Sequence, residues 1–271
     1  MSRMSSTPST SFSATKVLLN RAARHLLWPR PAAYYPFGIL RGRGNVFSKK
    51  AQMYISGYPR CGNTFAVTAF KSANPEARVM SHHHIPTFVI SQVRLGTPGL
   101  VLLRNPLDAA VSWAIHENET LEEAIAYWND YYKVLMPVRE HLFIARFEDV
   151  TTDFGGVIRA FNGKWGTSYV PFDHTPENAA HCFMVTEQEH TKPNGEIREM
   201  QVCRPSPQRR SVKEAHLRQL NQSDFLRDEL ARSKELYEKF LHFRGDGGRR
   251  TSTRLVPEKA TESTLQVGAP V

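Results

Sequence analysis

A short glycine-containing loop between a strand and an amphipathic helix is the feature that most restricts the fold of this sequence. The apolar run at residues 51–56 predicts a short buried strand, and residues 63–72 predict a helix. The segment that joins them and begins the helix is Gly57-Tyr58-Pro59-Arg60-Cys61-Gly62-Asn63-Thr64-Phe65. It nearly fits the phosphate-binding pattern GxxxxGK[ST], which requires a strand before it and a helix after it. Successive backbone N–H groups and a helix N-terminus bind an anion there without a metal cation. A Gly-Pro turn that resembles such a loop by accident is the alternative.

Two differences separate this loop from that of a nucleoside triphosphatase. Asn63 stands where a lysine would reach the β- and γ-phosphates, and the basic side chain lies inside the loop, at Arg60. The apolar strand predicted at residues 99–103 is followed by Arg104, where an aspartate would normally help to hold Mg²⁺. The sequence therefore favours an anionic donor that is handled without Mg²⁺.

Predicted strands alternate with predicted helices along the chain. Strands are expected at residues 51–56, 77–80, 99–103 and 142–146, and helices at 63–72, 107–116, 120–138, about 209–220 and about 224–242. This alternation predicts an α/β fold of the P-loop nucleotide-binding type, with a mainly parallel central sheet and helices on both faces. Ligands of such folds bind beyond the carboxyl ends of the strands.

His84 follows the second predicted strand, in the segment Ser81-His82-His83-His84-Ile85-Pro86. Three adjacent histidines suggest a metal site, but no Cys or carboxylate lies close in sequence to complete one, so we expect no metal there. An exposed histidine without a role is one interpretation. A general base near neutral pH, if His84 lies in a cleft, is the other.

Arg104 and Ser112 lie eight residues apart, at a strand end and two turns into the next predicted helix. A guanidinium fork and a hydroxyl in this arrangement can bind one anion. The alternative is that Arg104 caps the helix and that Ser112 is a small packing residue.

These segments resemble three motifs of the PAPS-dependent sulfotransferases, in the same order. Tyr58-Pro59-Arg60-Cys61-Gly62-Asn63-Thr64-Phe65 resembles their YPKSGTTW loop, which binds the 5′-phosphosulfate of 3′-phosphoadenosine 5′-phosphosulfate (PAPS). Arg104-Asn105-Pro106-Leu107-Asp108-Ala109-Ala110-Val111-Ser112-Trp113 resembles their RNPxDxxxSx segment, in which the Arg and the Ser bind the donor's 3′-phosphate. His84-Ile85-Pro86 is similar to the HLP stretch whose His is the catalytic base. The resemblance covers residues 52–116 and is faint beyond them.

The sequence departs from the family pattern at several positions. Arg60 replaces the loop Lys, and Cys61, Asn63 and Phe65 replace Ser, Thr and Trp. No RKGxxG segment is visible near the C-terminus. A basic loop that opens a helix, residues 204–213, is the candidate substitute, so that Arg209, Arg210 or Lys213 would contact the 3′-phosphate; a solvated helix start is the alternative.

The resemblance implies a metal-independent sulfotransferase that moves a sulfonate from PAPS to a hydroxyl or amine of an acceptor. Its expected site uses the backbone N–H groups of Cys61, Gly62, Asn63, Thr64 and Phe65, with Arg60 stabilising the departing phosphate and His84 taking the acceptor's proton. The acceptor would be a hydroxyl-bearing small molecule or a carbohydrate. A degenerate P-loop nucleotide kinase or NTPase and an inactive nucleotide-binding module are the alternatives.

The net charge of +9 is concentrated at the start of the chain. Residues 1–75 contain eleven basic residues and no Asp or Glu. We therefore interpret residues 1–47 as a basic, partly disordered leader, with a folded body over 48–243, a flexible tail over 244–271, and disorder over residues 1–15. Charge confined to a leader argues against a nucleic-acid binder. In residues 16–28 apolar side chains recur at helical spacing among basic ones. Such a segment is found in an untargeted extension, in a transit peptide or in a helix that lies on an anionic membrane surface.

The sequence gives fewer indications of the cellular compartment and the oligomeric state. The three cysteines include no CxxC pair, and no apolar stretch approaches the ~20 residues that span a bilayer. A reducing, cytoplasmic location is the expectation, with an organelle or a membrane surface as the alternative. An assembly of identical copies is compatible with the sequence.

Overall fold

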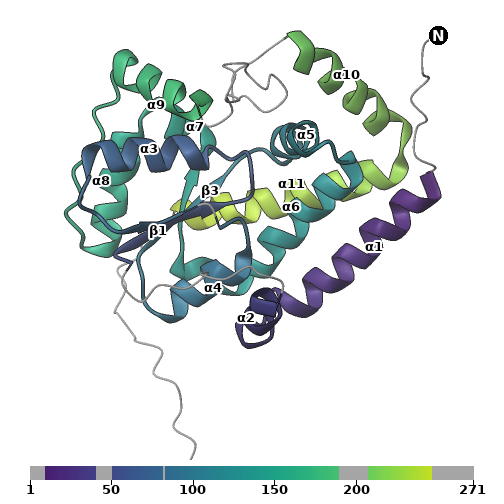
Figure 1. Ribbon diagram of the computed structural model, residues 1–271, viewed down its shortest axis with the longest axis horizontal. Coiled ribbons are helices and arrows are strands. Elements are labelled where there is room, and N and C mark those ends of the chain that lie inside the picture. The colour runs from purple at the N-terminus through teal and green to yellow at the C-terminus, as the bar shows by residue number, and fades with distance from the viewer. Residues whose placement is uncertain (1–9, 41–50, 82, 189–206, 246–271) are drawn as a thin grey trace, which may run out of the picture.

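The central sheet has four parallel strands in the order β2-β1-β3-β4 within the described residues. The computed structural model describes residues 10–40, 51–81, 83–188 and 207–245 (Figure 1). The strands are β1 (Met53–Gly57), β2 (Val79–Met80), β3 (Gly99–Leu103) and β4 (Phe143–Arg146). The α/β class and the parallel sheet are thereby confirmed, and each predicted strand is present, with three of them shorter than expected.

The two central strands are covered on both faces. Every residue of β1 and β3 is buried, as expected for a parallel strand between two helical layers. Their pairing is close at Gly99, where an added Cβ would lie 1.8 Å from the Tyr54 ring. The Tyr54 ring thus occupies the space that any other residue at position 99 would need.

Helices make up most of the described chain. In the body they are α3 (Asn63–Ala73), α4 (Pro86–Arg94), α5 (Pro106–Glu117), α6 (Leu121–Leu135), α7 (Phe147–Thr152), α8 (Phe154–Trp165), α9 (Pro176–Gln188), α10 (Pro207–Gln222) and α11 (Asp224–Gly245). The chain steps from β1 to β2 in one direction and from β2 to β3 in the other, so right-handed connections put α3 and α4 on opposite faces. Figure 1 shows this arrangement, with α6 on the side of α4 and packed against α11.

Local signals explain where several helices begin and end. The Thr120 hydroxyl accepts a hydrogen bond from the Glu123 N–H at 3.2 Å and so caps α6. The helix ends at Leu135 instead of residue 138, because Pro137 cannot continue it and the chain turns into a 3₁₀ helix at Met136–His141. At the start of α5, the Asn105 side chain accepts from the N–H groups of Leu107 and Asp108.

Four helices of the body were not predicted. α4 begins with Pro86 in its first turn, and the Asp153 side chain caps α8 by accepting from the Gly156 N–H at 2.8 Å. α7 and α9 were missed as well. α4 and α7 are short, with nine and six residues, and packing helps to fix all four: α4 against α6, α7 and α8 against β4, and α9 against α3.

The beginning of the chain differs from the expected leader. Two helices, α1 (Thr10–Leu27) and α2 (Pro31–Leu40), pack against α6 and α4, and Trp28 and Tyr34 are buried in the main core. The expectation of disorder is wrong for residues 10–15, which lie in α1, while residues 1–9 lie outside the described residues. The physical reason is a set of buried carboxylates on α6 and α11 that α1 neutralises. The expected tail, 244–271, lies beyond the described residues except for the last two of α11.

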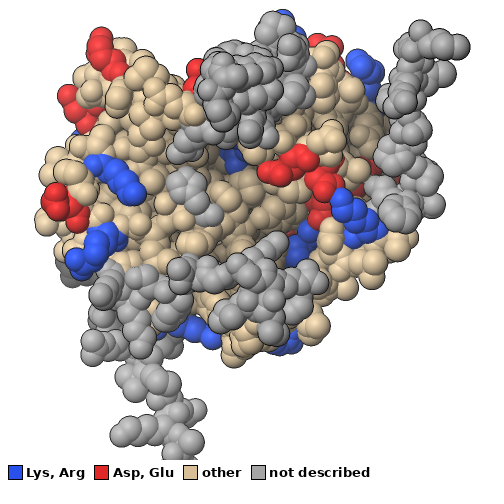
Figure 2. All heavy atoms as spheres, in the orientation of Figure 1, with Lys and Arg blue, Asp and Glu red and all other residues tan. Residues whose placement is uncertain are grey.

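Two further observations concern the surface. No helix in the described ranges is both long and apolar enough to cross a bilayer. Figure 2 shows Lys and Arg side chains scattered among uncharged and acidic ones on the face in view, without a continuous basic field.

Candidate functional site

The candidate site lies at the carboxyl ends of β1 and β3. These strands are neighbours, yet the connections that leave them run to opposite sides of the sheet, to β2 and to β4. In open α/β sheets, such a switch point leaves a crevice in which ligands bind. Gly57 of β1 pairs with Leu102 of β3, so the loop after Gly57 and Arg104 begin side by side.

The loop after β1 has an unusual backbone. Arg60 and Gly62 adopt left-handed conformations, with φ angles of 64° and 86°. A left-handed backbone at a non-glycine residue is uncommon, and such strain concentrates at functional sites. Gly62 also precedes α3 directly, and no side chain caps this helix. The N–H groups of the first turn therefore depend on other partners, as they do in loops that bind anions.

Three side chains of the loop point into the protein and form its base. Asn63 is buried and its Nδ2 donates to the Tyr58 carbonyl at 3.0 Å, within the loop. Cys61 is fully buried beside Tyr132, and burial raises the pKa of its thiol to about 12. Phe65 is buried against Phe172 and Phe183. These three residues can offer a ligand only their backbone N–H groups, whereas Thr64 is half-buried.

Arg60, Arg104 and Ser112 lie together. The Arg104 Nη1 donates to the Arg60 carbonyl at 2.9 Å, and the Arg60 Nε donates to the Ser112 hydroxyl at 3.3 Å. The Arg104 guanidinium also lies over the Phe147 ring, 4.1 Å from its centroid. Two cations and a hydroxyl thus converge on the switch point from the loop, the end of β3 and the second turn of α5. Such a set is suited to a ligand with more than one negative charge.

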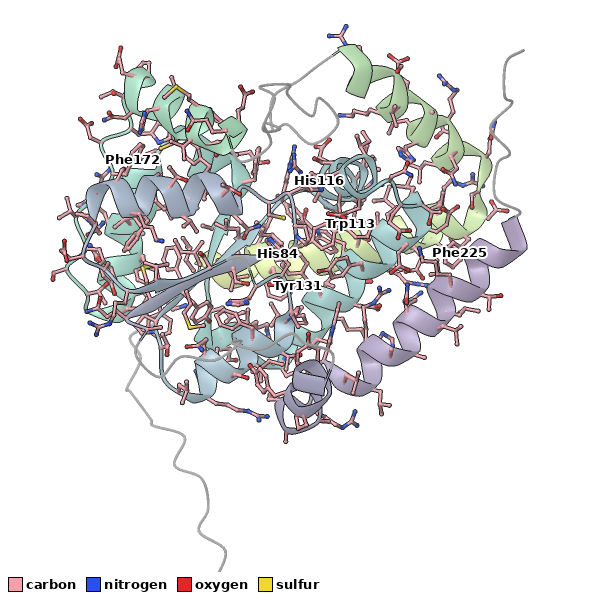
Figure 3. All side chains as sticks on the ribbon, viewed as in Figure 1. His84, Trp113, His116, Tyr131, Phe172 and Phe225 are labelled. Carbon is pink, nitrogen blue, oxygen red and sulfur yellow. The ribbon has the colours of Figure 1, made fainter. Side chains whose placement is uncertain are left out.

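His84 lies against the end of β1, near the centre of the molecule (Figure 3). Its Nδ1 is 2.9 Å from the Gly57 carbonyl, which can only accept a hydrogen bond. The proton of the neutral imidazole therefore resides on Nδ1, and Nε2 is the nitrogen with proton-accepting character. His83 has a different partner, the Phe88 ring at 4.5 Å.

Two residues that sequence reasoning missed hold the histidine segment in place. The Tyr127 hydroxyl donates to the His84 carbonyl at 2.7 Å, and the Ser56 hydroxyl donates to the His83 carbonyl at 2.8 Å. No local pattern connects Tyr127 with His84, because 43 residues separate them. The position of Ser56, just before the loop, was the one available signal.

The basic start of α10 comes close to this site at one residue. Lys213 Nζ lies 3.4 Å from the Asp108 carboxylate, in the first turn of α5 and four residues after Arg104. Arg210 is exposed. The side chain of Arg209 lies outside the described part of the structure, as does the segment before α10. A contact between any of the three and a 3′-phosphate stays a prediction.

No arrangement of metal ligands is found in the described residues, where no group of three or more His, Cys, Asp or Glu side chains could hold an ion. His82 lies outside those residues. The histidine segment is therefore best described through the hydrogen bonds of His83 and His84.

Comparison with known proteins gives no independent assignment. No protein-family model matches the sequence, and no curated protein matches it. The functional interpretation therefore rests on the residues and the geometry described above.

Proposed function

We propose that this protein is a sulfotransferase that moves a sulfonate from PAPS to a hydroxyl or amine of an acceptor. The observation that carries the proposal is the hydrogen-bonded chain Arg104–Arg60–Ser112 at the ends of β1 and β3. PAPS carries anionic groups at its 5′ and 3′ ends. A site for PAPS needs N–H groups that bind the anion at one end and cations that bind the anion at the other. The loop after β1 can supply the N–H groups, and Arg104 can supply a cation.

The two ends of the donor have different partners in this proposal. The N–H groups of Cys61–Phe65, with the Thr64 hydroxyl, bind the 5′-phosphosulfate at the start of α3. Arg104 and Ser112 bind the 3′-phosphate, to which each charge-assisted hydrogen bond contributes on the order of 1.5–3 kcal/mol. ATP has no 3′-phosphate, so this second contact provides selectivity for the donor.

The transfer step is a displacement at sulfur. The acceptor oxygen or nitrogen forms a bond to sulfur while the bond between sulfur and the bridging phosphate oxygen breaks. The electron pair of that bond stays on the 5′-phosphate of adenosine 3′,5′-bisphosphate, and Arg60 stabilises the developing charge. The His84 Nε2 takes the acceptor's proton, because Nδ1 already donates to the Gly57 carbonyl.

The acceptor side of the site lies near α5 and α6. Tyr127 donates to the His84 carbonyl, and its ring lies 5.3 Å from the ring of Trp113. Trp113 is half-buried and directly follows Ser112 in α5. We assign Trp113 to the wall that an acceptor would contact, whether the acceptor is a small molecule or a carbohydrate.

The test is transfer of a labelled sulfonate. Wild-type protein is incubated with PAPS labelled in the sulfonate and with pools of phenols, alcohols, amines and glycans, and the label is followed by chromatography. The proposal expects a labelled product together with adenosine 3′,5′-bisphosphate in equal amount. Binding of ATP with Mg²⁺ and phosphoryl transfer, with no affinity for the bisphosphate, would contradict it and favour the kinase alternative.

A further inference from the structure

Helix α1 buries a valine and an arginine on its inner side and leaves three leucines exposed. Leu18, Leu19 and Leu26 are exposed by 66%, 67% and 62%, whereas Arg24, on the opposite side, is only 9% exposed. A helix on a globular protein normally turns its apolar stripe inward and its charges to water. In α1 these three leucines face outward, whereas Arg24 and Val17 are buried on the inner side and Leu27 is half-buried.

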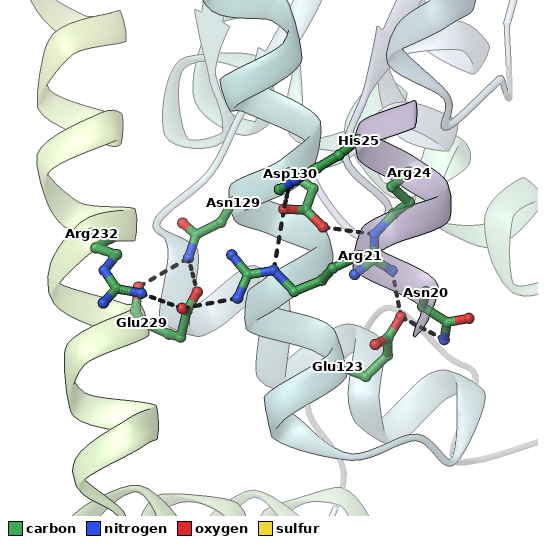
Figure 4. Close-up of polar contacts among 9 residues, drawn as sticks. All are labelled: Asn20, Arg21, Arg24, His25, Glu123, Asn129, Asp130, Glu229 and Arg232. Atoms are coloured by element: carbon green, nitrogen blue, oxygen red, sulfur yellow. Dashed lines mark hydrogen bonds and ion pairs between the residues drawn. The ribbon is translucent and has the colours of Figure 1, made fainter. Parts of the chain in front are cut away.

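Buried charges explain why α1 is fixed in this orientation. Arg24 pairs with Glu123 and, at 2.8 Å, with Asp130, and Arg21 lies 3.0 Å from Glu229 (Figure 4). All three carboxylates are almost completely buried. If α1 were rotated to turn the leucines inward, the buried carboxylates would lose their cations. The free-energy cost of those unpaired charges is larger than the gain from burying the leucines. The fold therefore holds an apolar stripe at the surface.

The stripe has a basic border. Lys16, His25 and Arg30 are exposed beside the leucines, and residues 1–75 contain no acidic residue. Lys16 pairs with Glu119 at the surface, and His25 lies 2.9 Å from Asp130. Exposed leucines flanked by Lys16 and Arg30, on a helix that contains no acidic residue, match a surface of anionic headgroups over acyl chains.

The size of the stripe argues against a second protein chain. Three leucines of this exposure present on the order of a few hundred Å² of apolar surface. A stable interface between two proteins needs about 800 Å² from each partner. A bilayer requires no such area, because single leucine side chains enter it individually.

We propose that the outer face of α1, defined by Leu18, Leu19 and Leu26, binds the surface of an anionic lipid bilayer, with the helix lying in the plane of the membrane. The helix runs along one edge of the molecule (Figure 1), so the body need not rearrange to place it there. This inference is independent of the proposed transfer reaction.

The test uses the full chain and vesicle flotation. Wild-type protein is mixed with vesicles of phosphatidylcholine alone or with phosphatidylserine added. We expect flotation with the anionic vesicles, weaker flotation with the neutral ones, and loss of binding as salt is raised. The double variant Leu18→Ser/Leu26→Ser should bind the anionic vesicles at least about tenfold more weakly, because two side chains no longer leave water.

A matched control separates this effect from a general loss of surface apolarity. Val170 is 57% exposed in another part of the protein, so Val170→Ser should float as the wild type does. Leu19→Ser alone should give an intermediate loss, and circular dichroism verifies that each variant is folded. Equal flotation of the double variant and the wild type, or no flotation of the wild type, would overturn the proposal. So would a dimer in sedimentation that the double variant converts to a monomer, since the face would then join two copies.

Discussion

Arg60 and Arg104 have different tasks at the switch point, although both are arginines next to a strand end. Arg60 uses a left-handed backbone, offers its carbonyl to Arg104 and reaches Ser112 with its side chain. Arg104 uses one of its five N–H donors for that carbonyl, and its guanidinium carbon lies 4.1 Å from the centroid of the Phe147 ring. Two contacts within the protein therefore hold the Arg104 side chain beside the loop.

Replacing Arg104 with Ala should weaken binding of adenosine 3′,5′-bisphosphate roughly 10- to 150-fold, the loss of one charge-assisted contact. Affinity for adenosine 5′-monophosphate, which has no 3′-phosphate, should change little. Calorimetric titration of both nucleotides measures the ratio. Arg94→Ala, at an exposed position in α4, is the control. An unchanged preference for the 3′-phosphorylated nucleotide would remove Arg104 from the site.

Replacing His84 with Ala should lower turnover about 10²- to 10⁴-fold and leave donor affinity nearly intact, because a general base acts on the acceptor and not on the nucleotide. Labelled-sulfonate transfer gives the rate, and titration of the bisphosphate gives the affinity. His141→Ala, an exposed histidine after α6, should match the wild type. Weakened donor binding with normal turnover would refute this role.

The sequence singled out the loop glycines, Arg60 and Arg104, and the structure brings the two arginines together at the ends of β1 and β3. The glycines and the loop arginine are local signals, and Arg104 follows an unmistakable apolar strand. Tyr127 and Phe147 were not predictable, because each acts on a site residue distant in the chain.

At the scale of elements, α1 shows how a pattern can predict a helix but not its orientation. Residues 16–28 have helical spacing, and the structure contains the helix. From the spacing of its leucines alone, we would expect them to face the core. The buried carboxylates of α6 and α11 instead pair with Arg21 and Arg24, which orients those arginines inward. No local sequence pattern predicts that a particular glutamate or aspartate will be buried.

The pairing of Arg24 should stabilise the protein strongly. In Arg24→Met two buried carboxylates lose their main cation, which costs about 3–5 kcal/mol and lowers the melting temperature by on the order of 10 °C. Lys16→Met, which breaks the exposed pair with Glu119, should cost less than about 1 kcal/mol. Differential scanning calorimetry compares the two.

A triple variant, in which both carboxylates that pair with Arg24 are also neutralised, completes this test. Adding Glu123→Gln and Asp130→Asn to Arg24→Met should recover much of the lost stability, because the buried partners no longer carry charge. Equal melting temperatures for Arg24→Met and Lys16→Met would show that α1 is not held by these charges.

At the scale of the whole molecule, the core is rich in buried hydroxyl and thiol groups. Tyr54, Tyr58, Tyr131 and Tyr132 are fully buried, and burial raises the pKa of each phenol. Burial likewise raises the pKa of the Cys61 thiol, to about 12. All five groups are neutral in the folded protein at pH values where the unfolded chain begins to ionise.

The protein should therefore lose stability in alkali. The contribution of these groups is fully present below about pH 8.5, the pKa of an unfolded cysteine, and falls as the pH rises through the raised folded values. Each group contributes a slope of about 1.4 kcal/mol per pH unit between its two pKa values. Urea titrations from pH 8 to 11 measure this, with tyrosinate absorbance as an independent signal. A constant free energy of unfolding over that range would show that the phenols ionise without unfolding.

A thermal-shift comparison of two nucleotides shows whether the site at Arg104 and Ser112 recognises a 3′-phosphate. Adenosine 3′,5′-bisphosphate without metal, at about 100 times its Kd, should stabilise the protein by about 2.7 kcal/mol and raise its melting temperature by several degrees. ATP with Mg²⁺ should shift it little, because it offers no 3′-phosphate to Arg104 and Ser112. A shift with Mg²⁺-ATP and none with the bisphosphate would contradict the proposed donor site and favour a nucleoside triphosphate as the ligand.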